Sequence, residues 1–95
     1  MRERFIERKF VEAVKKKGGF APKFVSPSLD GMPDRIVLFP IGKIAFVELK
    51  APGEIMRPLQ VRRKRQLEEL GFSVYCVDDV SQIDGVIKEI GGDAR

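Results

Sequence analysis

The chain has 95 residues, a single cysteine, no histidine and a formal net charge of +4 at pH 7. This length suits one domain around one core, and a composition of 43% hydrophobic and 34% charged residues is typical of a globular protein. One thiol without any histidine excludes internal disulfides, zinc sites and nucleophile triads that need an imidazole. Any catalysis must therefore use carboxylates, lysine or a metal ion held by oxygen atoms.

Apolar runs stay well short of the ~18 residues that a membrane span needs, and the N-terminus is charged from its second residue. We therefore expect a soluble, cytoplasmic protein.

Basic residues are unevenly distributed. One cluster falls within nine residues and a second run lies near the N-terminus: Arg57, Arg62, Arg63, Lys64 and Arg65, then Lys15, Lys16 and Lys17. Such clusters attract polyanions, and nucleic acid is the first partner to consider. A solvated helix face explains the same charges, and composition leaves both interpretations open.

The first third of the chain predicts a helix, a strand and a turn. Ile6, Phe10 and Val14 recur every four positions, which predicts an amphipathic helix over residues 2–17 that Gly18 ends. Residues 20–25 form a short predicted strand, and the sequence SPSLDGMP after it favours a turn.

The remainder predicts three strands and two helices. Residues 35–39 and 43–50 are rich in Ile, Val and Phe and predict strands. Pro58 suits the first position of a helix that Gly71 ends, residues 72–77 form another predicted strand, and apolar residues on one face of 83–90 predict a last helix.

The predicted order is α-β-β-β-α-β-α in a single domain, residues 1–95. The first three strands follow one another through short connections, which favours an antiparallel meander. The helix between the third and fourth strands makes a right-handed crossover, so the last strand should run parallel to the third. The fold class is therefore α/β, with a mixed sheet flanked by helices.

The turn at Pro40-Ile41-Gly42 sets the register of the hairpin. In a three-residue loop with two right-handed residues before a left-handed glycine, Phe39 pairs with Lys43. Counting outward places Asp34 directly opposite Glu48, with Lys50 on the same face. The Cβ atoms of Asp34 and Glu48 should then lie about 4.5 to 5.5 Å apart, where like charges destabilise the pair.

Two carboxylates at that distance need a shared proton or a bound cation. Magnesium is the simplest resolution, because it is commonly held by one or two carboxylates together with water and substrate phosphate. A shifted register would instead leave Asp34 serving the turn and Glu48 pairing with Lys50 at the sheet edge.

Three segments in order, GMPDRIVL, VELKAPG and RPLQVRRKRQLEELGF, resemble the small stand-alone VRR-NUC nucleases of phages and prophages. Pro33-Asp34 followed by Glu48-Leu49-Lys50 resembles their PD-(D/E)xK motif. The resemblance covers nearly the whole chain and implies a restriction-endonuclease-like core and a phosphodiesterase that depends on Mg²⁺ or Mn²⁺.

The resemblance also implies roles for single residues. Asp34 and Glu48 would ligate the metal, with the backbone carbonyl of Leu49 as a further ligand. Lys50 would orient or activate the attacking water and stabilise negative charge on the phosphate. Glu7 matches the acid of the family's first helix, and Gln60 its glutamine after the motif; as alternatives, Glu7 is a solvated helix acid and Gln60 a surface amide.

A DNA endonuclease with a preference for branched DNA such as Holliday junctions is therefore the main expectation, with the basic cluster from Arg57 to Arg65 contacting DNA. Similar proteins act as homodimers, and a separate helicase partner is compatible with the absence of a P-loop motif. Two alternatives remain open: a noncatalytic nucleic-acid-binding module, and a nuclease for flaps, nicks or single strands on the same scaffold.

Overall fold

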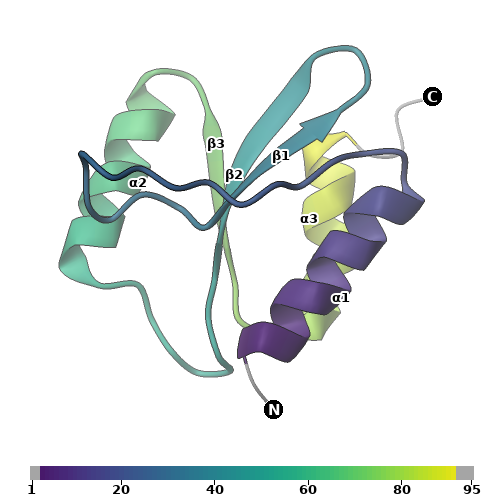
Figure 1. The fold of residues 1–95 in the computed structure, drawn as a ribbon, viewed down its shortest axis with the longest axis horizontal. Helices are drawn as coiled ribbons and strands as arrows, with labels where there is room; N and C mark the ends of the chain where they lie inside the picture. Colours follow the sequence, from purple (N-terminus) through teal and green to yellow (C-terminus); the bar gives the residue numbers. More distant parts are fainter. Residues whose placement is uncertain (1–2, 92–95) are drawn as a thin grey trace.

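A computed structural model describes residues 3–91. It has three layers, with helix α2 (Pro58–Glu69) on one face of a central sheet and helices α1 (Glu3–Lys16) and α3 (Ile83–Ile90) side by side on the other (Figure 1). Residue 2, the predicted helix start, lies outside the described residues. None of the helices within residues 3–91 is long and apolar enough to cross a membrane.

The sheet contains three strands: β1 (Arg35–Phe39), β2 (Lys43–Leu49) and β3 (Ser73–Val77). Their order is β1-β2-β3, with β1 antiparallel and β3 parallel to the central strand β2. The α/β fold class and the mixed sheet flanked by helices are therefore confirmed. A short 3₁₀ turn, η1 (Val80–Gln82), leads from β3 into α3.

The predicted first strand, residues 20–25, is wrong as a regular strand. This segment runs beside β1 but forms only two isolated bridges, Phe20 with Leu38 and Lys23 with Arg35. The ladder is interrupted at Pro22, whose carbonyl accepts the N–H of Ile36 at 3.2 Å but which has no N–H to return the bond. The predicted three-strand meander is thus a two-strand hairpin with a loosely paired segment along its edge.

The hairpin register is confirmed, and the predicted turn conformation is not. Phe39 pairs with Lys43 and Arg35 with Val47, as the three-residue loop requires. However, Ile41 has φ 68° and Gly42 has φ 72°, so two residues of the loop are left-handed rather than one. The loop therefore keeps its length while placing a β-branched residue in a region that only glycine and, at times, Asn or Asp adopt readily.

Replacing Ile41 with Asn should stabilise the protein. Its side chain is 84% exposed, so little packing is lost, whereas relief of the left-handed strain is worth about 1 kcal/mol. Thermal or urea unfolding of Ile41→Asn should show a higher free energy of unfolding. An equal or lower value would contradict the left-handed assignment at this residue.

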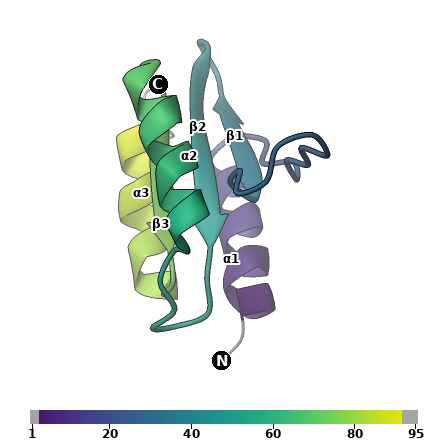
Figure 2. The same cartoon turned by 90° about the vertical axis from the view of Figure 1, so that its left-hand side faces the viewer.

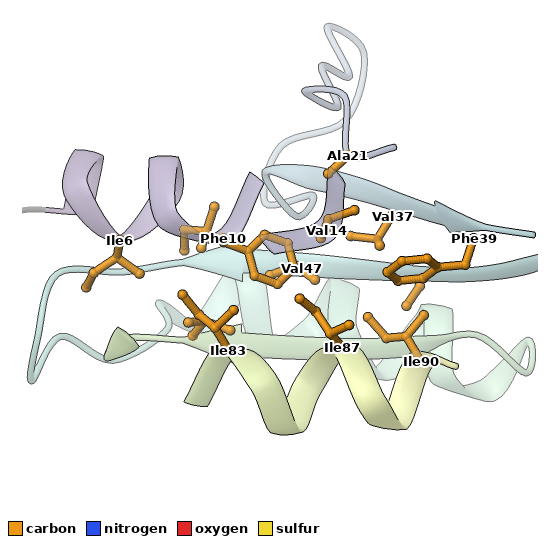
Figure 3. Packing of buried hydrophobic residues seen from close by; sticks show 13 residues of the cluster. Ile6, Phe10, Val14, Ala21, Val37, Phe39, Val47, Ile83, Ile87 and Ile90 are labelled. Atoms are coloured by element: carbon orange, nitrogen blue, oxygen red, sulfur yellow. The ribbon is translucent and has the colours of Figure 1, made fainter. Parts of the chain in front are cut away.

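The core lies between the sheet and the α1/α3 pair. Ile6, Phe10 and Val14 of α1 meet Ile83 and Ile87 of α3, and all five are buried (Figure 3). The sheet contributes the alternate residues of β2, since side chains along a strand point to opposite faces. These residues are Ala45, Val47 and Leu49.

The opposite, α2-facing side of β2 has a different composition. This side carries Ile44, Phe46 and Glu48. Helix α2 packs over it, and the only buried residue of α2 is Gln60. Figure 2 shows α2 lying along one side of this face and the segment before β1 projecting from the other. A charged residue and an amide are therefore buried together on the less apolar face of the sheet.

Candidate active site

Asp34 directly precedes β1 and lies beside the end of β2. Its Oδ2 accepts the backbone N–H of Leu49 at 2.8 Å, so a side chain continues the contact where the β1/β2 ladder ends at Arg35. Its own carbonyl accepts the N–H of Phe24 at 2.8 Å. Asp34 is thus held from both sides, one residue beyond the last pair of the ladder, Arg35 with Val47, and beside the end of β2 that carries Glu48.

Glu48 is the most constrained acid of the site. It is 2% exposed, and its Oε2 accepts a hydrogen bond from Gln60 Nε2 and lies 3.5 Å from Lys50 Nζ. Its Oε1 is buried and has no hydrogen-bond partner among the described residues. A buried carboxylate oxygen without a partner is energetically unfavourable, and a bound cation would satisfy it.

Burial and charge together change the acidity of Glu48. Desolvation raises its pKa first, the neighbouring charge of Asp34 raises it further, and Lys50 opposes both, so that the pKa reaches about 7. The charge of Asp34 therefore contributes to the raised pKa of Glu48.

Lys50 follows β2 and is nearly buried, its side chain being 13% exposed. Its N–H donates to Val77 of β3 at 2.9 Å, which fixes the backbone on which the ammonium stands. Leu49, between the two charged residues, uses its N–H for Asp34, and the role expected for its carbonyl stays a prediction.

Gln60 connects α2 to the acids. Its Oε1 accepts the N–H of Arg57 at 2.8 Å, which leaves Nε2 to donate to Glu48. The backbone contact therefore fixes which end of the amide faces the carboxylate. Gln60 is 5% exposed, so the alternative of a surface amide is wrong.

Glu7 is not brought to this pair of acids. Its Oε2 binds Arg35 at 2.9 Å to Nη2 and 3.1 Å to Nε, while Nη1 of the same arginine donates to the Ala21 carbonyl at 2.9 Å. Arg35 follows Asp34 and points to the other face of the sheet. The observed contacts of Glu7 thus belong to an ion pair that ties α1 to β1.

Glu3, one turn earlier on α1, interacts with the site instead. Burial raises its pKa, the charges of Asp34 and Glu54 raise it further, and Lys50 lowers it. Figure 1 shows the first turn of α1 beside the loop that leaves β2. Sequence reasoning missed Glu3 because Glu3 and Glu7 lie on the same side of the helix and differ only in which of them Arg35 binds.

The basic residues around α2 fall into two groups. Arg57, Arg62 and Arg65 are exposed. Arg63 donates from Nε to the Asp30 carbonyl at 2.8 Å, and Lys64 pairs with Glu68 at 2.8 Å. The exposed arginines present positive charge to solvent on and before α2, where they could contact a polyanion.

The described residues contain no group of three or more His, Cys, Asp or Glu side chains arranged to hold a metal. Asp34 and Glu48 supply two carboxylates, which suits a cation that completes its coordination with water and substrate oxygen atoms.

A mixed α/β core with Glu48 on β2 and with Asp34 and Lys50 at neighbouring strand ends has the architecture of the restriction-endonuclease-like nucleases. Comparison with known proteins agrees: the chain is 51% identical over 85 residues to "Putative nuclease p44" of Acyrthosiphon pisum secondary endosymbiont phage 1, covering 87% of this chain and 91% of that protein. A solved structure described as a VRR_NUC domain superposes with a TM-score of 0.84 at 29% identity, over 90% of this chain and 94% of the other.

No family model matches the chain. On the strength of the phage relative and the superposed structure, the chain belongs to the VRR-NUC nucleases, as the sequence resemblance indicates.

Proposed function

We propose that this nuclease is a DNA endonuclease that requires Mg²⁺ or Mn²⁺ and prefers branched DNA. The observation that supports metal dependence most strongly is the buried, unpartnered Oε1 of Glu48 beside a second carboxylate. Oxygen donors of this kind suit hard divalent cations, and Asp34 and Glu48 would hold the ion. When bound, it would supply Lewis-acid stabilisation of charge on the phosphate.

Other residues of the site act on the substrate or on these acids. Lys50 places a positive charge 3.5 Å from Glu48 Oε2, where it can orient an attacking water and stabilise charge on a phosphate oxygen. Gln60 holds the Glu48 carboxylate in place. Glu3, whose pKa responds to Asp34 and Lys50, adds negative charge at the rim of the site.

Binding of DNA would use the exposed arginines around α2. Arg57, Arg62 and Arg65 can reach phosphate groups without breaking any contact described above. Such contacts position nucleic acid without determining sequence preference, which is compatible with recognition of DNA structure.

A homodimer is supported by an apolar row on the α2-facing side of the sheet. Phe20 bridges Leu38, Leu38 pairs with Ile44, and the parallel register places Phe72 beside Ile44. These four side chains are 36% to 65% exposed. The order aromatic, aliphatic, aliphatic, aromatic can match itself about a two-fold axis, so we propose a second copy of this chain as its partner.

A cleavage assay tests the proposed function. Linear, flapped, nicked and four-way DNA should be compared with Mg²⁺, Mn²⁺ and EDTA, and cleavage should require metal and be fastest on the branched substrates. A noncatalytic binding module would instead bind DNA equally well in EDTA and cut nothing. Equal cleavage of linear duplex and junction, or a monomeric mass in solution, would reject junction preference or dimerisation respectively.

A further inference from the structure

Helix α2 contacts both of the segments that deliver the two acids. Gln60 binds Glu48 of β2 directly. Arg63, three residues later and therefore on the same side of the helix, donates from Nε to the carbonyl of Asp30 at 2.8 Å. Its Nη1 donates to Gln66 Oε1 at 3.0 Å, which holds the guanidinium in this orientation.

The segment that Arg63 binds leads into Asp34 within four residues. It packs closely on α2 at Gly31, where a Cβ atom would lie 2.8 Å from Leu59 Cγ and 3.0 Å from the Leu59 carbonyl oxygen. Gly31 also has φ 85°, a conformation that favours glycine. Pro33, directly before Asp34, is buried. The segment is thus short and held at both ends, so a shift at Asp30 is transmitted to Asp34.

We propose that Arg63 is a positioning residue for the metal site rather than a DNA contact. By binding the Asp30 carbonyl it fixes the Asp34 segment on the same helix that fixes Glu48 through Gln60. One helix therefore sets the separation of the two carboxylates. This inference rests on the proposed metal-dependent nuclease function.

The arginine side chain suits this role. A guanidinium can donate in two directions from one plane, here to a backbone carbonyl and to an amide oxygen. Both acceptors are neutral, so neither contact is an ion pair. Arg62, the preceding residue, is exposed and carries the same charge, which makes it a matched control.

The test compares Arg63→Ala with Arg62→Ala, since each removes one positive charge from α2. Three quantities are measured: the Mg²⁺ concentration for half-maximal cleavage, the rise in melting temperature that Mg²⁺ causes without DNA, and the affinity for four-way DNA in EDTA. Arg63→Ala should raise the half-saturating Mg²⁺ concentration about tenfold or more and shrink the melting shift, as loss of groups that orient metal ligands commonly does. Arg62→Ala should weaken DNA binding and leave the Mg²⁺ requirement unchanged.

Gly31→Ala provides a second variant in case Arg63→Ala does not fold. It disturbs the packing of the same segment on α2 at the neighbouring residue, without changing any charge, because the added Cβ would press on Leu59. We expect a raised Mg²⁺ requirement with unchanged DNA affinity in EDTA.

An unchanged Mg²⁺ requirement in Arg63→Ala would overturn the inference. If the variant also loses DNA affinity, Arg63 is a phosphate contact. If it loses only melting temperature, Arg63 is a purely structural residue. If Arg63→Ala does not fold, an unchanged Mg²⁺ requirement in Gly31→Ala overturns it. The proposed function fails separately, if the unmodified chain cuts no DNA with any metal.

Discussion

Replacing Asp34 with Asn should abolish cleavage while leaving the fold intact. The substitution removes one of two carboxylates proposed to hold the metal, and losing several kcal/mol of transition-state stabilisation corresponds to a rate at least about 10³-fold lower. An Asn side chain keeps an oxygen that can accept the Leu49 N–H, so the contact at the end of β2 can persist. Single-turnover cleavage and thermal unfolding of the same preparation would measure both effects.

Removal of the Asp34 charge also predicts the direction in which the stability of the metal-free protein changes. Asp34 is the second-largest cause of the raised pKa of Glu48, after burial. Without that negative charge, ionised Glu48 is less unfavourable, so metal-free Asp34→Asn should melt at the same temperature as the unmodified protein or higher at pH 8. Asp30→Asn, an exposed acid four residues earlier, serves as the matched control and should cleave normally.

Wild-type cleavage by Asp34→Asn would reject the proposed metal site. A markedly lower melting temperature would mean that Asp34 is primarily a structural residue, which is the turn-serving alternative considered from the sequence.

The hairpin was predictable from sequence because local constraints determine it. Short runs rich in Ile, Val and Phe define the strands, and a loop of three residues sets the pairing of Phe39 with Lys43 whatever the conformation of Ile41. Side-chain alternation then follows, which brings Asp34 and Glu48 to one face. The placement of Asp34 near Glu48 can therefore be predicted by counting residues outward from the turn.

Features that depend on competition between distant partners were not predictable. Whether Glu3 or Glu7 approaches the acids depends on Arg35, which binds Glu7 across the sheet from the site. Likewise, Arg63 is distinguished from the exposed arginines of the basic cluster by its bond to the Asp30 carbonyl. Neither contact has a signal in helical periodicity, because each is set by tertiary packing.

The metal-free protein should lose stability as the pH rises from about 5 to about 7. Glu48 has an ordinary pKa of 4.5 and a pKa of about 7 in the folded protein. Between these values the folded state binds more protons than the unfolded state, so the free energy of unfolding falls with increasing pH and levels off above about 7. Each unit of pKa difference corresponds to about 1.4 kcal/mol, so the loss should amount to a few kcal/mol.

Glu48→Gln isolates this contribution. The amide cannot ionise, so its unfolding free energy should fall much less across the same pH range, when both proteins are measured by urea unfolding in EDTA. The Gln side chain keeps an oxygen for the bond from Gln60 Nε2. Parallel pH profiles for the two proteins would show that Glu48 does not carry the raised pKa.

Metal binding should reverse the trend, because a cation binds the ionised carboxylate and competes with the proton. At pH 8 Glu48 is ionised and Mg²⁺ should raise the melting temperature, whereas at pH 5.5 the bound proton must first be displaced and the same concentration should have little effect. Glu48→Gln should show only a small Mg²⁺ effect at either pH. A melting shift in the unmodified protein that is equal at pH 5.5 and pH 8 would place the metal away from Glu48, because only binding at this acid competes with its proton.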